Sequence, residues 1–204
     1  MAYQTRGRDP LLDSTTQAVI EKRSKELLGI GLVVLGVLVA MMIGSYSPDD
    51  PNWMLASDAP VQNWLGRFGA SLAQPLFMIG GVATWGIALT LVVWGVRLVF
   101  HYGEERLVGR IIFAPIAIAV AAIYAATLPA PAGWPHSFGV GGFFGDTVLS
   151  VLLTLLPIGV DFAIRLFSLI FGVGMLALSA FVLGFTSDEI RRGWKLFLIG
   201  LIMA

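Results

Sequence analysis

Four stretches of eighteen or more residues without a charged side chain constrain this sequence more than any other feature. They lie at 27–46, 72–96, 111–128 and 166–187. A helix needs roughly 20 apolar residues to cross the ~30 Å hydrocarbon core of a bilayer. Lipid offers no hydrogen-bond partner to an open backbone, so each stretch is predicted to be a helix. The sequence therefore predicts an all-α membrane protein with four transmembrane helices.

The composition excludes most soluble and catalytic classes. Hydrophobic residues make up 57% of the 204 residues and charged residues 13%, against about 25% charged in a typical soluble domain. There is no cysteine and only two histidines, which argues against a disulfide framework and a Cys/His metal site. None of the three lysines follows a glycine, so the chain has no P-loop. We expect no catalytic residue, no cofactor and no metal in this segment.

Lysine and arginine alternate between the segments that separate the four spans. Eleven of the thirteen lie in the N-terminal tail 1–26, between spans 2 and 3, and after span 4. The predicted outer loops, 47–71 and 129–165, hold only Arg67 and Arg165. Positive residues stay on the cytoplasmic side of membranes. Both termini are therefore predicted to face the cytoplasm, with the two loops in the periplasm and the chain in the inner membrane.

The second outer loop contains an apolar run that cannot be part of span 4. If 147–187 were one helix, it would measure about 60 Å, twice the thickness of the hydrocarbon core. Pro157 and Gly159 are expected to break it. Three polar residues at helical spacing line the run before this break: Thr147, Ser150 and Thr154. Such a stripe favours a helix that lies in the outer interface, and a re-entrant hairpin is the alternative.

The C-terminal segment 188–204 has the pattern of a new helix. Thr186 and Glu189 form a capping box at its start. Basic side chains at 191, 192 and 195 lie on one face, and apolar ones on another. This pattern predicts a juxtamembrane amphipathic helix on the inner leaflet. The last nine residues are all apolar or glycine and then stop, so we expect the chain to be part of a longer protein.

Small residues at four-residue spacing recur in three of the spans. Such residues let membrane helices approach closely, and we expect them to pack this one bundle rather than join subunits. Asp161 and Arg165 stand one helical turn apart, where they could pair at the outer water boundary. The candidate packing positions are Gly36, Ala40, Gly44, Gly80, Ala88, Ala117, Ala121 and Ala125.

Three motifs in the outer half of the chain resemble one known family. The run 45–53, Ser-Tyr-Ser-Pro-Asp-Asp-Pro-Asn-Trp, resembles the Ser-Phe/Tyr-x-Pro-x-Asp-Pro-x-Trp signature of the FtsK/SpoIIIE DNA translocases. Asn63, Gly66 and Gly69, with Leu-Phe at 76–77, resemble the start of that family's second span. Gly-Gly-Phe-Phe-Gly at 141–145 resembles its Gly-Gly-x-x-Gly element before span 4. Order and spacing agree over residues 27–195.

The resemblance implies a role that the residues alone do not. Members of the family join a four-span anchor to a linker and a hexameric motor that pumps DNA at the division septum. It implies a homo-oligomer, other division-septum proteins and the lipid bilayer as partners, and ATP, Mg²⁺ and DNA only through the motor. The outer-loop motifs would then shape a partner surface or simply hold the loops: Pro48, Asp50, Pro51, Trp53, Gly141, Gly142 and Gly145. The alternative function is a small polytopic transporter or channel subunit, which should carry charge deep in its spans.

Overall fold

The structure is a computed structural model that describes residues 13–102, 107–156 and 158–203. Within these ranges all regular structure is helical. The elements are α1 (Ser14–Gly44), α2 (Gly66–Gly80), the 3-10 turn η1 (Gly81–Thr84), α3 (Trp85–Val99), α4 (Leu107–Ala126), α5 (Gly142–Leu155), α6 (Val160–Val182) and α7 (Ser187–Met203). The predicted all-α class is confirmed.

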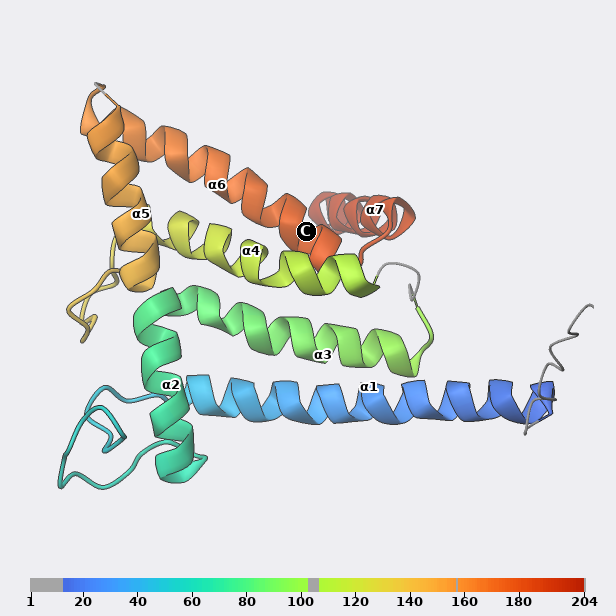
Figure 1. Cartoon of the computed structure of the whole chain (residues 1–204). Coiled ribbons are helices and arrows are strands. Elements are labelled where there is room, and N and C mark those ends of the chain that lie inside the picture. Colours follow the sequence, from blue (N-terminus) through green and yellow to red (C-terminus); the bar gives the residue numbers. More distant parts are fainter. Residues whose placement is uncertain (1–12, 103–106, 157, 204) are drawn as a thin grey trace, which may run out of the picture.

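The long helices lie side by side in the order α1, α3, α4, α6, with shorter helices across both ends (Figure 1). At one end α2 and α5 run across the helix axes and pack on each other, next to loops 45–65 and 127–141. The opposite end carries the start of α1, the end of α3, the start of α4, and α7. The two outer loops of the sequence analysis thus share one end of the molecule.

Four helical segments are long and apolar enough to cross a membrane. They are Thr15–Gly44, Gly66–Val99, Gly109–Ala126 and Val160–Val182. This confirms the four spans and makes the chain a multi-pass membrane protein. The first helix begins well before the predicted span at 27–46, and its charged start carries turn-to-turn ion pairs. Lys25 Nζ lies 2.8 Å from Glu21 Oε1, and Arg23 lies one turn from its partner Glu26.

The second span departs from the prediction, because 72–96 is not one straight helix. α2 ends at Gly80, Gly81 takes the left-handed φ of 55°, and the chain turns before α3 begins. Figure 1 shows α2 lying across the direction of α3. The 3-10 turn and α3 together rise about 30 Å, enough to cross the hydrocarbon core without α2. The chain turns here because Gly81 makes a close backbone contact with Gly142, far along the chain.

We call the contact of Gly81, Gly141, Gly142 and Gly145 with their neighbours the glycine junction. Val82 N donates to Val140 O at 3.0 Å, which brings η1 against the start of α5. A Cβ on Gly81 would lie 2.1 Å from that carbonyl, and one on Gly142 would lie 2.5 Å from Gly81 N. Gly141 and Gly145 approach α4 in the same way, because a Cβ added to either would lie within 2.3 Å of Ala122 O. Only glycine allows three backbones to meet so closely.

Two helix pairs make up the rest of the bundle, α1 with α3 and α4 with α6. In the first pair a Cβ on Gly36 would lie 2.9 Å from Val92 N and 3.1 Å from Ala88 O. Two helical turns earlier in α1, a Cβ on Gly29 would lie 2.7 Å from Gly95 O. Small residues therefore let these two helices approach to backbone contact. Gly29 and Gly95 take part although the four-residue spacing did not single them out.

The other candidate packing residues also fall inside the bundle. Ala121 and Ala117 line a small cavity of about 40 Å³ between α3, α4 and α6. The remaining positions are Ala125, which is buried, Ala40, which is half-buried, Gly44, which faces Trp85, and Gly80, which faces Thr84. The structure thus brings these residues to contacts within one chain.

The apolar run before span 4 forms α5, which ends where the sequence predicts. Leu156 is extended, with φ −103° and ψ 117°, as expected for a residue before proline. Pro157 itself lies outside the described residues, and α6 begins at Val160. On its inner face α5 places Leu149 against the buried Ala163 and Phe167 of α6. This contact fixes α5 across the end of the α4/α6 pair.

Replacing Gly142 with alanine tests the glycine junction, and Gly133→Ala is its matched control. Both glycines have a left-handed φ, 68° and 82°, but Gly133 has open space where a Cβ would stand. In the control, the free energy of unfolding should fall only by the cost of placing alanine at a left-handed φ, about 1–2 kcal/mol. Gly142→Ala adds a backbone clash, so its free energy of unfolding should fall by about 3 kcal/mol or more. Thermal unfolding in detergent measures both, and equal losses would contradict a required close approach.

Candidate functional sites at the two ends of the bundle

The first outer loop is organised around a buried carboxylate. Asp50 is 1% exposed, and its two oxygens accept hydrogen bonds from Gln62 N at 2.8 Å and Asn63 N at 2.9 Å. Asn63 is buried as well, and its side-chain amide donates to Met42 O at 2.8 Å. Asp50 therefore ties the end of α1 to the segment that starts α2. Charge-assisted bonds of this kind are the strong ones.

Two further polar side chains of the loop complete this frame. The Ser45 hydroxyl donates to Met41 O at 2.7 Å and accepts from Trp64 N at 2.9 Å, so it links the end of α1 to the residue before α2. Asn52 donates its amide to Asp50 O and accepts from two backbone N–H groups that follow it. The resulting loop has a defined shape without any regular secondary structure.

The structure divides the predicted loop residues into two groups. Asp50 and Pro51 are buried, and Pro48 is half-buried. Trp53 is 76% exposed. Two more aromatic side chains near the start of α2 are similarly open, Trp64 and Phe68. The first group holds the loop, and the second leaves large apolar side chains free to meet another surface.

An aromatic cluster that the sequence analysis did not single out joins the two loops. The His136 ring stacks on Phe138, with centroids 4.9 Å apart, and on Tyr46, with centroids 5.5 Å apart. Phe77 of α2 and Trp134 pack against the same imidazole. The members come from three separate segments, so no local pattern marks them. Histidine in a loop was the one available signal, and it is uninformative alone.

Burial in this cluster changes the titration of two side chains. It lowers the pKa of His136, because the charged imidazolium loses hydration among the rings. Burial also raises the pKa of Tyr46 to about 12, helped by the negative charges of Asp49 and Asp50. The Tyr46 hydroxyl donates to Gln74 Oε1 at 2.8 Å. Both groups are therefore neutral when the two loops are packed together.

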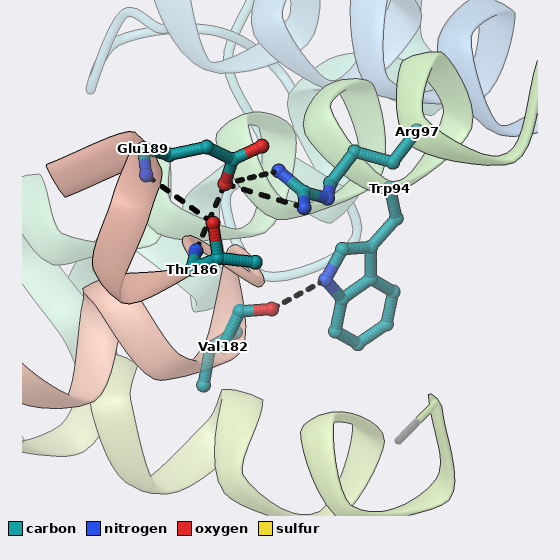
Figure 2. A network of polar contacts seen from close by, with 5 residues as sticks. All are labelled: Trp94, Arg97, Val182, Thr186 and Glu189. Carbon is teal, nitrogen blue, oxygen red and sulfur yellow. Dashed lines mark hydrogen bonds and ion pairs between the residues drawn. The ribbon is translucent and has the colours of Figure 1, made fainter. Parts of the chain in front are cut away.

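At the opposite end, a polar network fastens the turn between α6 and α7 (Figure 2). The Trp94 indole N–H donates to Val182 O at 2.7 Å, at the C-terminal end of α6. Arg97, one turn further along α3, places its guanidinium nitrogens 3.4 and 3.5 Å from Glu189 Oε2. The predicted capping box is confirmed, since Thr186 N donates to Glu189 and Glu189 N donates to Thr186 Oγ1. One carboxylate thus serves as helix cap and ion-pair partner.

The charges of this network are matched to the helix ends. The Thr186 backbone N–H holds the pKa of Glu189 below its usual range, and the positive charge of Arg97 contributes. From α4, the guanidinium of Arg110 lies against Gly184, where an added Cβ would be 2.7 Å from Cζ. Cations favour the negative end of a helix dipole, here that of α6. The turn is therefore held from α3 and from α4.

Within the described residues no group of three His, Asp or Glu side chains could hold a metal ion. Asp161 and Arg165, which stand where they could pair, form no ion pair among the described residues. The fold and the two end sites define a class: a four-span membrane domain with ordered loops at one end and a fastened terminal helix at the other.

Comparison with known families gives this class a name. Residues 21–195 match the family described as the 4TM region of DNA translocase FtsK/SpoIIIE. The chain belongs to this family, and the predicted resemblance to the FtsK/SpoIIIE translocases is confirmed. The matched family covers the membrane region and not the motor.

Individual relatives agree. DNA translocase FtsK of Azospirillum brasilense is 31% identical over 151 residues, which are 73% of this chain and 24% of that protein. That of Caulobacter vibrioides is 28% identical over 158 residues, 75% of this chain and 19% of that protein. That of Brucella suis is 32% identical over 125 residues, 61% and 15% respectively. The chain therefore matches about a quarter or less of these curated relatives. No solved structure matches it.

Removing the buried carboxylate should destabilise the first loop. Asp50→Ala leaves two backbone N–H groups without their acceptor, which should cost about 2–4 kcal/mol. Asp49→Ala is the matched control, because the neighbouring Asp49 is exposed and should change stability little. Thermal unfolding of the purified chain in detergent reports the difference. A similar melting temperature for both variants would mean that Asp50 does not hold the loop.

The aromatic cluster should make the fold sensitive to acid. The pKa of His136 is lower in the folded chain, so the unfolded chain binds more protons below pH ~6.5. Stability should be full above that pH and fall as the solution is acidified towards the lower folded pKa. His136→Phe keeps the ring stacking and removes the contribution of His136 protonation to this pH dependence. Between pH ~7 and pH ~5 the melting temperature of this variant should fall less than that of the unaltered chain. An equal fall in both proteins would show that His136 does not cause the acid sensitivity.

Proposed function

We propose that this chain is the membrane anchor of a DNA translocase that couples chromosome segregation to cell division. In this role it places an ATP-driven motor, which lies outside this chain, at the septum. The observation that carries the proposal is the family match over residues 21–195, together with relatives named DNA translocase. DNA, ATP and Mg²⁺ would be bound by the motor and not by this segment.

The arrangement of the helices supports an orientation with both termini in the cytoplasm. The start of α1, the end of α3, the start of α4 and α7 share one end, and both long loops share the other (Figure 1). Eleven of the thirteen basic residues belong to the first set of segments. This is the distribution expected in a bacterial inner membrane, with the loops in the periplasm. A linker after α7 would then enter the compartment that holds the chromosome.

The fastened α6–α7 turn supports the anchor role from the cytoplasmic side. Trp94, Arg97 and Glu189 tie the start of α7 to α3, and so fix the direction in which α7 leaves the bundle. A motor of six subunits would need its tethers to leave in a defined direction. We propose that the family's hexamer gathers six such anchors.

The first loop supports a role in recognising other division-septum membrane proteins. Asp50 and Pro51 are buried within the loop, whereas Trp53 is exposed and takes no part in its hydrogen bonds. Exposed tryptophan is typical of the residues that dominate protein interfaces. We assign partner specificity to Trp53 and loop shape to Asp50, with Gly141, Gly142 and Gly145 fixing the second loop beside it.

A transporter or channel subunit is the alternative, and nothing in the structure favours it. The helices α3, α4 and α6 carry four described charged residues, Arg97, Arg110, Asp161 and Arg165. Each lies within the first two turns or the last turn of its helix. Transport paths normally place charge deeper in the membrane.

The test follows septal localisation and membrane abundance of a fluorescent fusion in dividing cells. Trp53→Ala should leave abundance near that of the unaltered chain and lower the septal signal severalfold. Met54→Ala, at the exposed neighbouring position, is the matched control and should localise normally. Asp50→Ala should lower abundance. Normal septal localisation of Trp53→Ala would remove the proposed partner surface.

Reporter fusions test the orientation on which the anchor role depends. Fusions after Tyr102 and after Ala204 should report the cytoplasm, and fusions after Asp58 and Ser137 the periplasm. A periplasmic reporter at Ala204 would place the motor on the side without DNA, which contradicts the proposed function.

A further inference from the structure

The described surface holds one large groove that neither the family match nor the proposed function uses. It lies between α4 and α6 and has a volume of about 510 Å³. α5 covers the opposite side of this helix pair, where it packs on Ala163 and Phe167. The groove therefore remains open to the surroundings of the spans.

Polar and apolar residues are separated along the groove. Tyr124 and Thr127, at the C-terminal end of α4, line it together with Arg165 and Ser168, at the start of α6. All four lie towards the end of the molecule that carries α5 (Figure 1). A cation and three hydroxyl groups thus stand at the depth where a span meets the membrane–water boundary.

Further along α6 the groove becomes apolar. Its wall is formed by Leu169, Val173 and Leu176, which are 67%, 59% and 67% exposed. Gly172 gives the Tyr124 ring room, because an added Cβ would lie 3.1 Å from Tyr124 Cε2. From Arg165 to Leu176 the helix rises about 16 Å, close to the thickness of one leaflet's hydrocarbon.

The charge at the polar end of the groove is not paired within the described part of the chain. Among the described residues Arg165 has no ion pair and no hydrogen bond, although Asp161 stands one turn before it on α6. The Asp161 carboxylate does not line the groove. An unmatched arginine above an apolar channel of one leaflet's length is complementary to an amphiphile with an anionic head.

We propose that this groove binds an anionic phospholipid of the leaflet on the α5 side. The phosphodiester lies at Arg165 and Ser168, and one acyl chain runs along Gly172 and Val173 towards Leu176. A transmembrane helix from a partner fits less well, because its apolar side chains would leave the charge of Arg165 without a counter-charge, whereas a phosphodiester supplies one. The lipid would fill the seam between α4 and α6 at its outer half.

Native mass spectrometry of the purified chain in detergent tests this site. Phosphatidylglycerol should bind about fivefold more tightly than phosphatidylcholine with the same acyl chains, the factor expected for one arginine near an anionic surface. Arg165→Gln should remove the preference. Arg67→Gln, at an exposed arginine of α2 outside the groove, is the matched control and should keep it.

A second pair of variants tests the acyl channel. Val173→Trp should obstruct it and weaken both lipids severalfold. Ile170→Trp, on an exposed face of α6 outside the groove, should leave binding unchanged. If both arginine variants lost the preference for phosphatidylglycerol equally, or both tryptophan variants weakened lipid binding equally, the lipid would be bound unspecifically. Either result would overturn the proposal. Displacement of phosphatidylglycerol by millimolar inorganic phosphate, or lipid retained only by a dimer, would also overturn it.

Discussion

The glycine junction is the contact on which the rest of this structure depends. Gly81 and Gly142, 61 positions apart in the chain, bring the backbones of η1 and α5 together, and Gly141 and Gly145 press α5 onto α4. Side chains at these positions would force the three backbones apart. Through this contact α2 and α5 turn across the end of the bundle. The outer loops that precede them are consequently held side by side, joined by the aromatic cluster around His136.

The same two helix pairs are fastened again at the other end. Trp94 and Arg97 of α3 reach the end of α6 and the cap of α7, while Arg110 of α4 lies against the turn between them. Between the two fastenings, α3, α4 and α6 line a small cavity of about 40 Å³. Contacts at both ends therefore fix the outer loops and the start of α7 to the same bundle.

Local signals in the sequence predict the parts of this fold that local physics decides. Uncharged length predicts the four spans, and Thr186 with Glu189 predicts the cap of α7. The turn at Gly81 was missed because it lies inside an uninterrupted apolar stretch, and its φ is set by a partner far along the chain. Arg97 and Glu189 are likewise 92 residues apart. For Asp50 the sequence identified the residue, but only the fold separates its buried role from the exposed position of Trp53.

Depth measurements in a bilayer can show whether α2 lies across the end of the bundle instead of extending α3. Since the chain has no cysteine, single spin labels can be placed at the exposed α2 positions Phe68, Leu72 and Ile79. Collision with oxygen and with a water-soluble nickel chelate then measures the depth of each label in a lipid bilayer. If α2 lies across the end of the bundle, the three labels should sit at nearly equal, shallow depths. One straight helix along the membrane normal would instead separate Phe68 from Ile79 by about 16 Å, and that gradient would contradict it.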